Sequence, residues 1–163
     1  MTANTLTGSG IPLYRAAQMR ELDRLAIEAA GIPGYTLMQR AAGAAWAALR
    51  TRWPQARTLV VLCGAGNNGG DGYVLARLAR ADGRNVRVLQ LGDEQRIRGD
   101  ALTARSAWLE AGGSVESFDA TLLAGADLIV DALLGTGFAG RLDTHWIEVI
   151  DTINGAGVPV MAM

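Results

Sequence analysis

A continuous apolar run followed at once by a glycine-rich stretch is the feature that most constrains the fold of this chain. The run, Thr58–Cys63, shows no alternation of apolar and polar residues, which is typical of a parallel strand buried on both faces. The stretch after it, residues 64–72, holds five glycines and two asparagines. An apolar helical pattern follows over residues 73–81. The sequence therefore predicts a buried strand, a tight loop and a helix, which is how a βαβ unit begins.

Strand and helix patterns alternate along the rest of the chain. The alternation, with short glycine-containing turns, predicts right-handed crossovers and a parallel sheet that is covered on both faces. We therefore predict an α/β fold, a three-layer Rossmann-like domain with a mainly parallel sheet, over residues 12–163 and with a flexible tail over residues 1–11. Two N-terminal helices precede the first strand. Further strands are predicted over 85–91, 128–134 and 158–163, and further helices over 100–111 and 146–154.

Composition excludes several classes of partner. The net charge is −1, which gives no electrostatic footprint for nucleic acid or an anionic membrane. The longest apolar runs fall well short of the ~20 residues that a membrane-spanning helix needs. Cys63 is the single cysteine, so no disulfide framework exists, and the first ten residues lack the pattern of a signal peptide. We expect a cytoplasmic protein that binds neither nucleic acid nor membrane.

Two glycine-rich loops are expected at the same edge of the sheet. Residues 64–72 and 135–140 each follow a predicted strand, and ligands of parallel α/β sheets bind beyond the carboxyl ends of strands. Glycines let backbone N–H groups approach an anion, and Asn67, Asn68 and Asp71 add amides and a carboxylate. The structural alternative is a tight turn with Asp71 as the helix N-cap. The number of glycines and asparagines favours a ligand over that alternative.

Asp131 is a carboxylate within an apolar strand, where it needs hydrogen bonds or a cation. Lysine is absent from the chain, which leaves arginine, backbone amides or a metal as partners. The residues alone leave open whether Asp131 is structural or binds a ligand. His145 is the single histidine, so a histidine-based transition-metal site is excluded. The G-x-G-x-x-G match at residues 64–69 is weak, and Asp93 is only a loose candidate for the acidic residue that accompanies it.

Two segments resemble the YjeF N-terminal domain family, the NAD(P)H-hydrate epimerases. They are Cys-Gly-Ala-Gly-Asn-Asn-Gly-Gly-Asp-Gly-Tyr at 63–73 and Val-Asp-Ala-Leu-Leu-Gly-Thr-Gly-Phe at 130–138, and stretches of both preceding helices match as well. The resemblance implies interconversion of the R and S epimers of hydrated NADH and NADPH. It also implies a partnership with a fused or separate ADP- or ATP-dependent dehydratase.

The resemblance also implies roles for particular residues. Asn68 and Asp131 would bind a potassium ion, and Asp71 is the one loop carboxylate available to carry a proton. The substrate would lie between two walls, made by Asn67, Asn68, Gly69, Gly70 and Asp71 on one side and by Gly135, Thr136, Gly137, Phe138, Ala139, Gly140 and Arg141 on the other.

The resemblance further implies an Asp-Ile-Pro-Ser-Gly segment after the last strand, and the chain stops before it. We therefore expect an incomplete domain with little activity as it stands. The alternative function is a non-catalytic nucleotide-binding or protein-interaction scaffold of the same fold, and retention of Asn68, Asp71 and Asp131 favours the enzyme. An NAD(P)-dependent dehydrogenase fits less well, because no Tyr-Lys or histidine-based catalytic pair is present. The alanine-rich helix from Ala41 favours a homodimer.

Overall fold

The computed structural model describes residues 14–138 and 140–163, so the predicted tail at 1–11 lies outside the described residues. The chain divides into two compact units, residues 1–32 and Pro33–Met163. The described part of the first unit is built on helix α1 (Ala16–Glu28). Arg24 of this helix pairs with Glu21 and Glu28, one turn away on either side.

The second unit is built on a five-stranded parallel sheet with the order β3-β2-β1-β4-β5. The predicted α/β fold is confirmed. The strand order reverses between β1 and β4, which makes their carboxyl ends the topological switch point of the sheet. The strands are β1 (Thr58–Cys63), β2 (Asn85–Gln90), β3 (Val115–Ser117), β4 (Leu128–Ala132) and β5 (Val160–Ala162).

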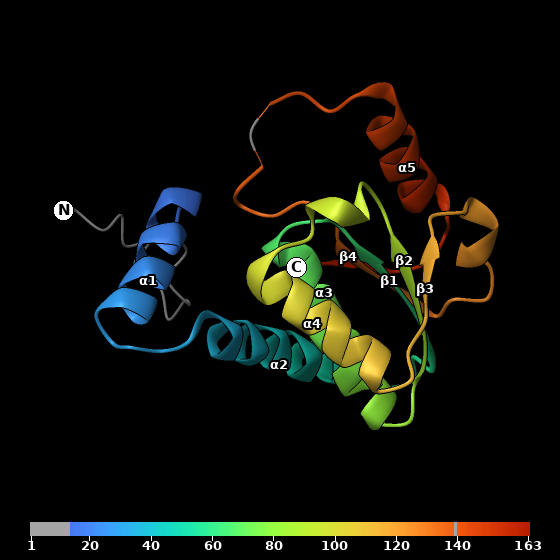
Figure 1. Cartoon of the computed structure of the whole chain (residues 1–163). Helices are drawn as coiled ribbons and strands as arrows, with labels where there is room; N and C mark the ends of the chain where they lie inside the picture. The colour runs from blue at the N-terminus through green and yellow to red at the C-terminus, as the bar shows by residue number, and fades with distance from the viewer. Residues whose placement is uncertain (1–13, 139) are drawn as a thin grey trace, which may run out of the picture. The chain divides into compact units, whose positions relative to one another are not determined.

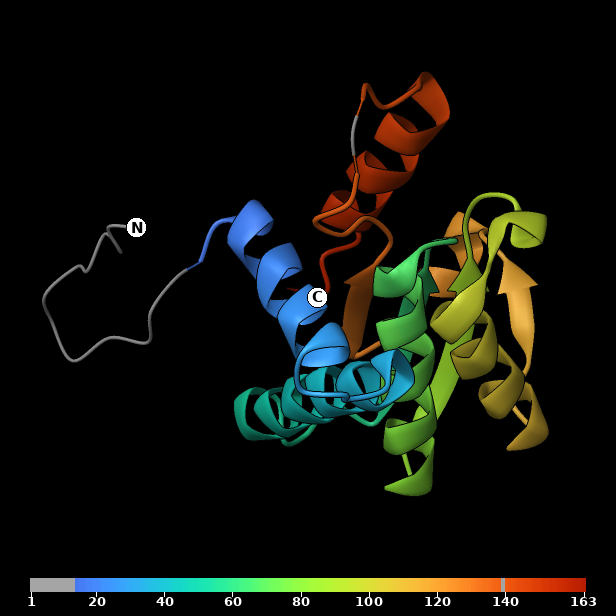
Figure 2. The same ribbon diagram turned by 60° about the vertical axis from the view of Figure 1, so that its left-hand side comes forward.

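Helices cover both faces of the sheet, as the three-layer prediction requires (Figure 1). Leu59 and Val61 of β1 face one cluster of core residues, and Val60 and Leu62 face the other, because side chains of a strand alternate. The first face carries α2 (Gly34–Arg52), α3 (Asn67–Ala81) and α4 (Gly99–Glu110). Figure 2 shows α2 running across α3 on this face. The second face carries α5 (Thr144–Gly155) and the short 3-10 helix η2 (Ala120–Leu123).

The start of α3 differs from the sequence prediction. The helix begins at Asn67, six residues before the predicted start, so the glycine-rich stretch is itself largely helical. Its N-cap is Gly66, and Asp71 lies in the second turn, so the alternative that makes Asp71 the cap is wrong. Glycine and asparagine are poor helix formers, which is why periodicity did not reveal these turns. Among the described helices, none combines the length and apolar character needed to cross a bilayer.

Candidate functional site

The loops that follow β1 and β4 touch at the switch point of the sheet. The N–H of Gly64 donates to the carbonyl oxygen of Ala132 at 3.1 Å. A Cβ atom at Gly64 would lie 2.0 Å from the carbonyl oxygen of Leu133, and one at Gly69 would lie 1.9 Å from that of Gly64. Only glycine fits at either position, because no side-chain atom can approach backbone so closely. The two glycine-rich loops therefore meet, as the parallel topology predicts.

Two further glycines seat α3 against its neighbours. A Cβ at Gly70 would lie 2.6 Å from Cε of Met38, and one at Gly72 would lie 2.7 Å from Cβ of Ala132. Around Gly66, by contrast, a Cβ would meet no atom within 4 Å. Four of the five glycines in residues 64–72 thus have a packing reason. Their number alone is therefore weaker support for a ligand than the sequence implied.

Asn68 occupies the contact between the two loops. A Cβ at Gly135 would lie 3.0 Å from Cβ of Asn68 and 3.4 Å from its Oδ1. The Nδ2 atom of Asn68 is buried and has no hydrogen-bond partner among the described residues. A buried amide donor without a partner is costly unless a bound group satisfies it. Asp71 lies three residues further on, which places it on the same face of α3.

Asp131 is half-buried near the end of β4. Its Oδ1 accepts a hydrogen bond from the N–H of Leu133 at 3.0 Å, so backbone supplies one of the partners that the sequence left open. Alternation along β4 puts Asp131 on the same face as Ile129, the face that α5 covers. Asn68 comes from α3, which covers the opposite face. The two oxygen-bearing side chains therefore approach the switch point from different layers. Among the described residues, no group of three or more His, Cys, Asp and Glu side chains could hold a metal ion.

The loop after β4 leads from the carboxyl end of that strand to α5. The N–H of Phe138 donates to the carbonyl oxygen of Gly135 at 3.0 Å and closes a turn, and the Phe138 ring is 46% exposed. The loop ends where Asp143 caps α5 by accepting from the N–H of Trp146 at 3.0 Å. Trp146 lies beside the end of β2, since a Cβ at Gly92 would be 3.8 Å from its Cζ2. The loop therefore extends from β4 to the far side of β1.

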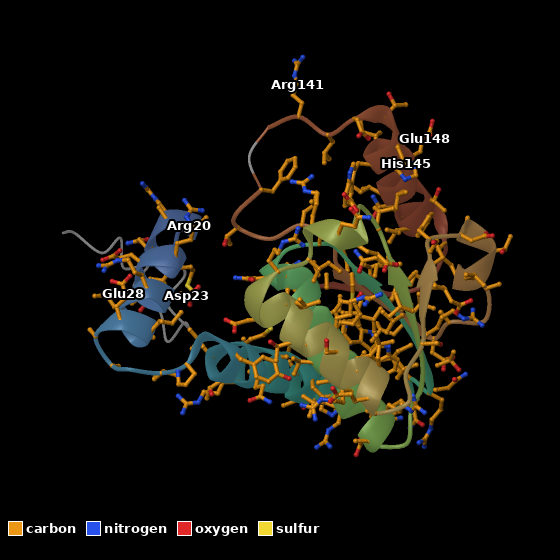
Figure 3. All side chains as sticks on the ribbon, viewed as in Figure 1. Arg20, Asp23, Glu28, Arg141, His145 and Glu148 are labelled. Carbon is orange, nitrogen blue, oxygen red and sulfur yellow. The ribbon has the colours of Figure 1, made fainter. Side chains whose placement is uncertain are left out.

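Not every residue predicted for the second wall turns toward the first. Arg141 extends outward from the loop, away from the sheet (Figure 3). Ala139 lies outside the described residues. Gly137 and Thr136 are exposed on the same loop, and Gly140 has a positive φ of 121°, a conformation that favours glycine. Gly135 contacts the first wall through Asn68.

The remaining candidates from the sequence have structural positions. Cys63 is fully buried, and burial raises the pKa of its thiol, which fits a core residue. Asp93 accepts from the N–H of Gln95 at 2.8 Å and so caps the 3-10 helix η1 (Glu94–Arg96). His145 is exposed on α5 (Figure 3).

Two polar residues behind the site escaped the sequence interpretation. The Tyr73 hydroxyl donates to Oε1 of Gln90 at 2.5 Å in the buried space between α3 and β2. The signal in the sequence was a glutamine at the end of an apolar strand, after Val88 and Leu89. A buried amide at that place needs a partner, and the nearest candidates are side chains of the covering helix.

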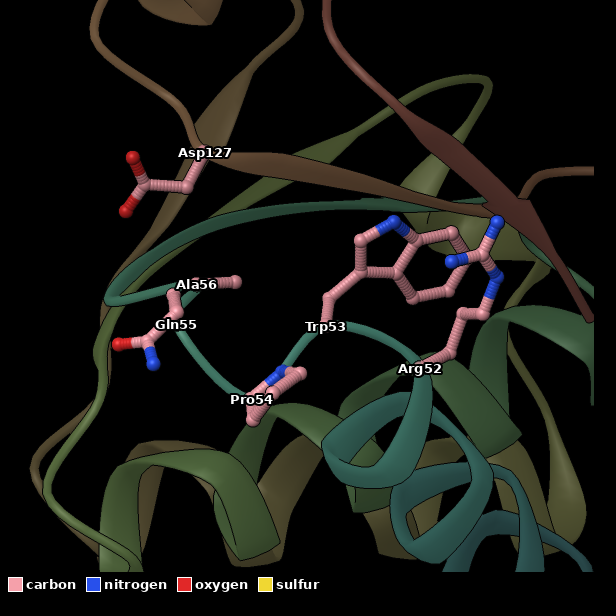
Figure 4. A pocket seen from close by; sticks show the side chains of 6 residues that line it. All are labelled: Arg52, Trp53, Pro54, Gln55, Ala56 and Asp127. Atoms are coloured by element: carbon pink, nitrogen blue, oxygen red, sulfur yellow. The ribbon is translucent and has the colours of Figure 1, made fainter.

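A shallow hollow lies at the opposite edge of the sheet, where β1 and β4 begin (Figure 4). Asp127 accepts there from the N–H groups of Thr58 and Arg57, both at 2.8 Å, and these bonds lower its pKa. The guanidinium of Arg52 lies 5.5 Å from the ring centre of Trp53. Every one of these polar groups has a partner, and the hollow is remote from both glycine-rich loops. We therefore assign the hollow a structural role only.

Comparisons with known proteins find relatives whose names agree with one another. Residues 34–163 match the family described as YjeF-related protein N-terminus. The bifunctional NAD(P)H-hydrate repair enzyme Nnr of Coxiella burnetii is 45% identical over 93% of this chain and 31% of its own length. The Escherichia coli enzyme of the same name is 39% identical over 100% of this chain and 32% of its own length. The chain thus spans about a third of the length of these bifunctional relatives.

Shorter relatives are matched over most of their length. The NAD(P)H-hydrate epimerase of Limosilactobacillus fermentum is 39% identical over 91% of this chain and 71% of its own length. A crystal structure of yeast ynu0 superimposes with a TM-score of 0.82 at 20% identity, covering 93% of this chain and 69% of the yeast chain. That likeness supports the fold. The family match and the coverage of the Limosilactobacillus relative together show that this chain belongs to the family of YjeF-related N-terminal domains.

Proposed function

We propose that this domain is an NAD(P)H-hydrate epimerase, which interconverts the R and S epimers of hydrated NADH and NADPH. The observation that carries the proposal is the contact of Asn68 with Gly135 at the switch point, where a buried amide donor has no hydrogen-bond partner in residues 14–138 and 140–163. Relatives named NAD(P)H-hydrate epimerase at 37% and 39% identity support the reaction.

The substrate is proposed to lie between the two glycine-rich loops. Backbone N–H groups at the start of α3, with the positive end of the helix behind them, suit the phosphates of the nucleotide. An acceptor oxygen of the substrate would satisfy Nδ2 of Asn68. The remaining contacts would come from Asn67, Gly69, Gly70 and Asp71 in α3 and from Gly135, Thr136, Gly137, Phe138 and Gly140 in the second loop.

Epimerisation inverts the carbon that bears the hydroxyl group of the hydrate. The inversion needs loss and return of hydroxide, or ring opening, and both routes require proton transfer by a positioned group. Asp71 is the proposed proton carrier, because it shares a face of α3 with Asn68. Asn68 is proposed to orient the substrate so that the reacting carbon faces that carboxylate.

A potassium ion is the proposed cofactor, held by Oδ1 of Asn68 and the carboxylate of Asp131. Both side chains offer oxygen atoms, the ligands that hard cations prefer. A carboxylate has about four lone-pair positions, so the hydrogen bond from the N–H of Leu133 leaves room for a cation. When bound, the ion would supply positive charge close to developing negative charge.

A non-catalytic scaffold of the same fold is the second candidate. The observation that favours it is the packing of Gly64, Gly69, Gly70 and Gly72, which explains these glycines without a ligand.

As partners of either form we propose a second copy of the chain, through the alanine-rich α2, and a fused or separate ADP- or ATP-dependent dehydratase. A single buried cysteine fits the reducing cytoplasm as the place of the reaction.

The deciding experiment incubates the R epimer of hydrated NADPH (NADPHX) with this protein and potassium chloride. Chromatography then follows its conversion to the S epimer. We expect the S epimer to form slowly but still faster than in buffer alone, and Asp71→Asn to lower kcat about 100-fold, within the range of general acid–base catalysis. Asp151→Asn, on an exposed position of α5, is the matched control and should keep wild-type activity. A folded wild-type protein that binds NADPHX without accelerating its epimerisation would establish the scaffold instead.

A further inference from the structure

One buried hydrogen bond ties the start of α3 to the neighbouring strand. Tyr73 is fully buried and Gln90 is 5% exposed, and the Tyr73 hydroxyl donates to Oε1 of Gln90 at 2.5 Å. Among the described residues, the core is made of hydrophobic side chains except for the amide of Gln90. A buried pair of this kind rigidifies its surroundings, since either group alone would be left without a partner.

Further hydrogen bonds lead from Gln90 to the carboxyl ends of β2 and β1. Nε2 of Gln90 donates to the carbonyl oxygen of Leu91 at 2.9 Å. The N–H of Leu91 donates to the carbonyl oxygen of Cys63, also at 2.9 Å. Cys63 is the last residue of β1 and directly precedes Gly64. A short chain of hydrogen bonds thus connects Tyr73 of α3 to the place where the first glycine-rich loop begins.

An ion pair between α4 and the loop after β2 lies near Tyr73. Arg105 of α4 pairs with Glu94 of η1 at 2.7 Å. Burial raises the pKa of Tyr73 well above its ordinary value, and the nearby charge of Arg105 opposes this only in part. Burial thus favours the neutral phenol, the form that can donate to Gln90.

The first turns of α3 benefit from such a hydrogen bond, because their own residues contribute little to the stability and orientation of the helix. Asn67, Asn68, Gly69 and Gly70 favour the helix poorly, and glycines have no side chain that could fix the rotation of the helix. The close packing of Gly70 and Gly72 sets how near α3 lies to its neighbours. A directional hydrogen bond adds a constraint on the rotation about the helix axis.

We propose that Tyr73 and Gln90 are positioning residues, whose hydrogen bond sets the rotation of α3 and thereby aims Asn68 and Asp71 at the switch point. Tyr73 follows Asp71 by two residues, so a rotation of the helix at Tyr73 moves the Asp71 carboxylate directly. The kinetic consequence rests on the proposed function, whereas the structural consequence does not.

Hydrogen–deuterium exchange on Tyr73→Phe tests the structural consequence. We expect the backbone amides of residues 70–74, the first in α3 with helical hydrogen-bond acceptors, to exchange at least ten times faster than in the wild type, with unchanged exchange in β4. The matched control is Tyr35→Phe, which removes a phenol of α2 that makes no hydrogen bond with the described residues, and it should alter neither region. Equal acceleration over the whole sheet would mean a merely structural bond and would overturn the proposal.

Steady-state kinetics tests whether the hydrogen bond orients Asp71. For Tyr73→Phe we expect kcat to fall at least tenfold and KM to stay within twofold. Gln90→Met removes the same bond together with the bond from Nε2 to Leu91, so it should lower kcat at least as much, and the double variant should be no worse than Gln90→Met alone. Unchanged kcat in a folded variant would overturn the proposal. If the wild type itself lacks epimerase activity, the proposed function fails, and the exchange experiment still decides the positioning role.

Discussion

Asn68 lies directly against Gly135, so that a Cβ atom at Gly135 would be 3.0 Å from Cβ of Asn68. The contact joins the first turn of α3 to the loop that follows β4, two segments separated by more than sixty residues of sequence. It makes the two glycine-rich loops a single assembly at the switch point. Any group bound by one loop must therefore fit against the other.

Gly135→Ala is expected to impair the site without unfolding the domain. Its φ is not positive, so alanine brings no backbone strain, but the new methyl group would press on Cβ, Cγ and Oδ1 of Asn68. We expect a loss of about tenfold in kcat/KM, or about 1.4 kcal/mol of transition-state stabilisation, with the melting temperature nearly unchanged. Gly155→Ala, where a Cβ would meet open space, is the control. Wild-type activity in Gly135→Ala would show that the contact has no part in the site.

Two helical glycines should respond to alanine in opposite directions. At Gly69 a Cβ would lie 1.9 Å from the carbonyl oxygen of Gly64, which is backbone and cannot move aside, so we expect a loss of about 3 kcal/mol in the free energy of unfolding. At Gly43, in the middle of α2, a Cβ would meet nothing within 4 Å. Alanine there should stabilise by about 0.5–1 kcal/mol, because it lowers the entropy of the unfolded chain. Urea unfolding measures both, and equal effects would contradict the packing explanation.

The main architecture could be predicted because it depends on long, regular patterns. The apolar runs around Val61 and Val130 have the composition of doubly covered parallel strands, and parallel strands end at one edge of the sheet. The meeting of the two loops follows from that topology. The strand β3 was missed because it has three residues, none of them buried, and so carries no apolar pattern.

The details of the site could not be predicted because they depend on tertiary contacts. The helical conformation of Asn67 and Gly69 goes against their propensities and exists because α3 packs on the sheet. The bond between Tyr73 and Gln90 joins residues seventeen positions apart on different elements. Arg141 follows a glycine with a positive φ, and nothing in its sequence neighbourhood indicates which way its side chain turns.

Asp131→Asn is expected to separate the charge of this residue from its hydrogen bond. The amide oxygen of asparagine can still accept from the N–H of Leu133, so the turn after β4 should persist. Loss of the negative charge should raise the potassium concentration for half-maximal activity at least tenfold, which is about 1.4 kcal/mol of binding free energy. Asp143→Asn is the matched control, because asparagine preserves the cap of α5 while removing a charge from the same loop. A normal potassium response in Asp131→Asn would exclude Asp131 as a ligand.

Asp127→Asn is expected to change how stability depends on pH in acid. Hydrogen bonds from the N–H groups of Thr58 and Arg57 lower the pKa of Asp127 in the folded protein. A carboxyl group with a lowered folded pKa stabilises the fold fully above its unfolded pKa, about 3.9, and loses that effect as the pH falls through the folded pKa. The variant should therefore have a lower melting temperature than the wild type at about pH 6. The difference in melting temperature should narrow as the pH falls below about 4. Thermal melts across this range measure the difference, and a constant difference would show that the carboxylate charge contributes nothing at the start of β1.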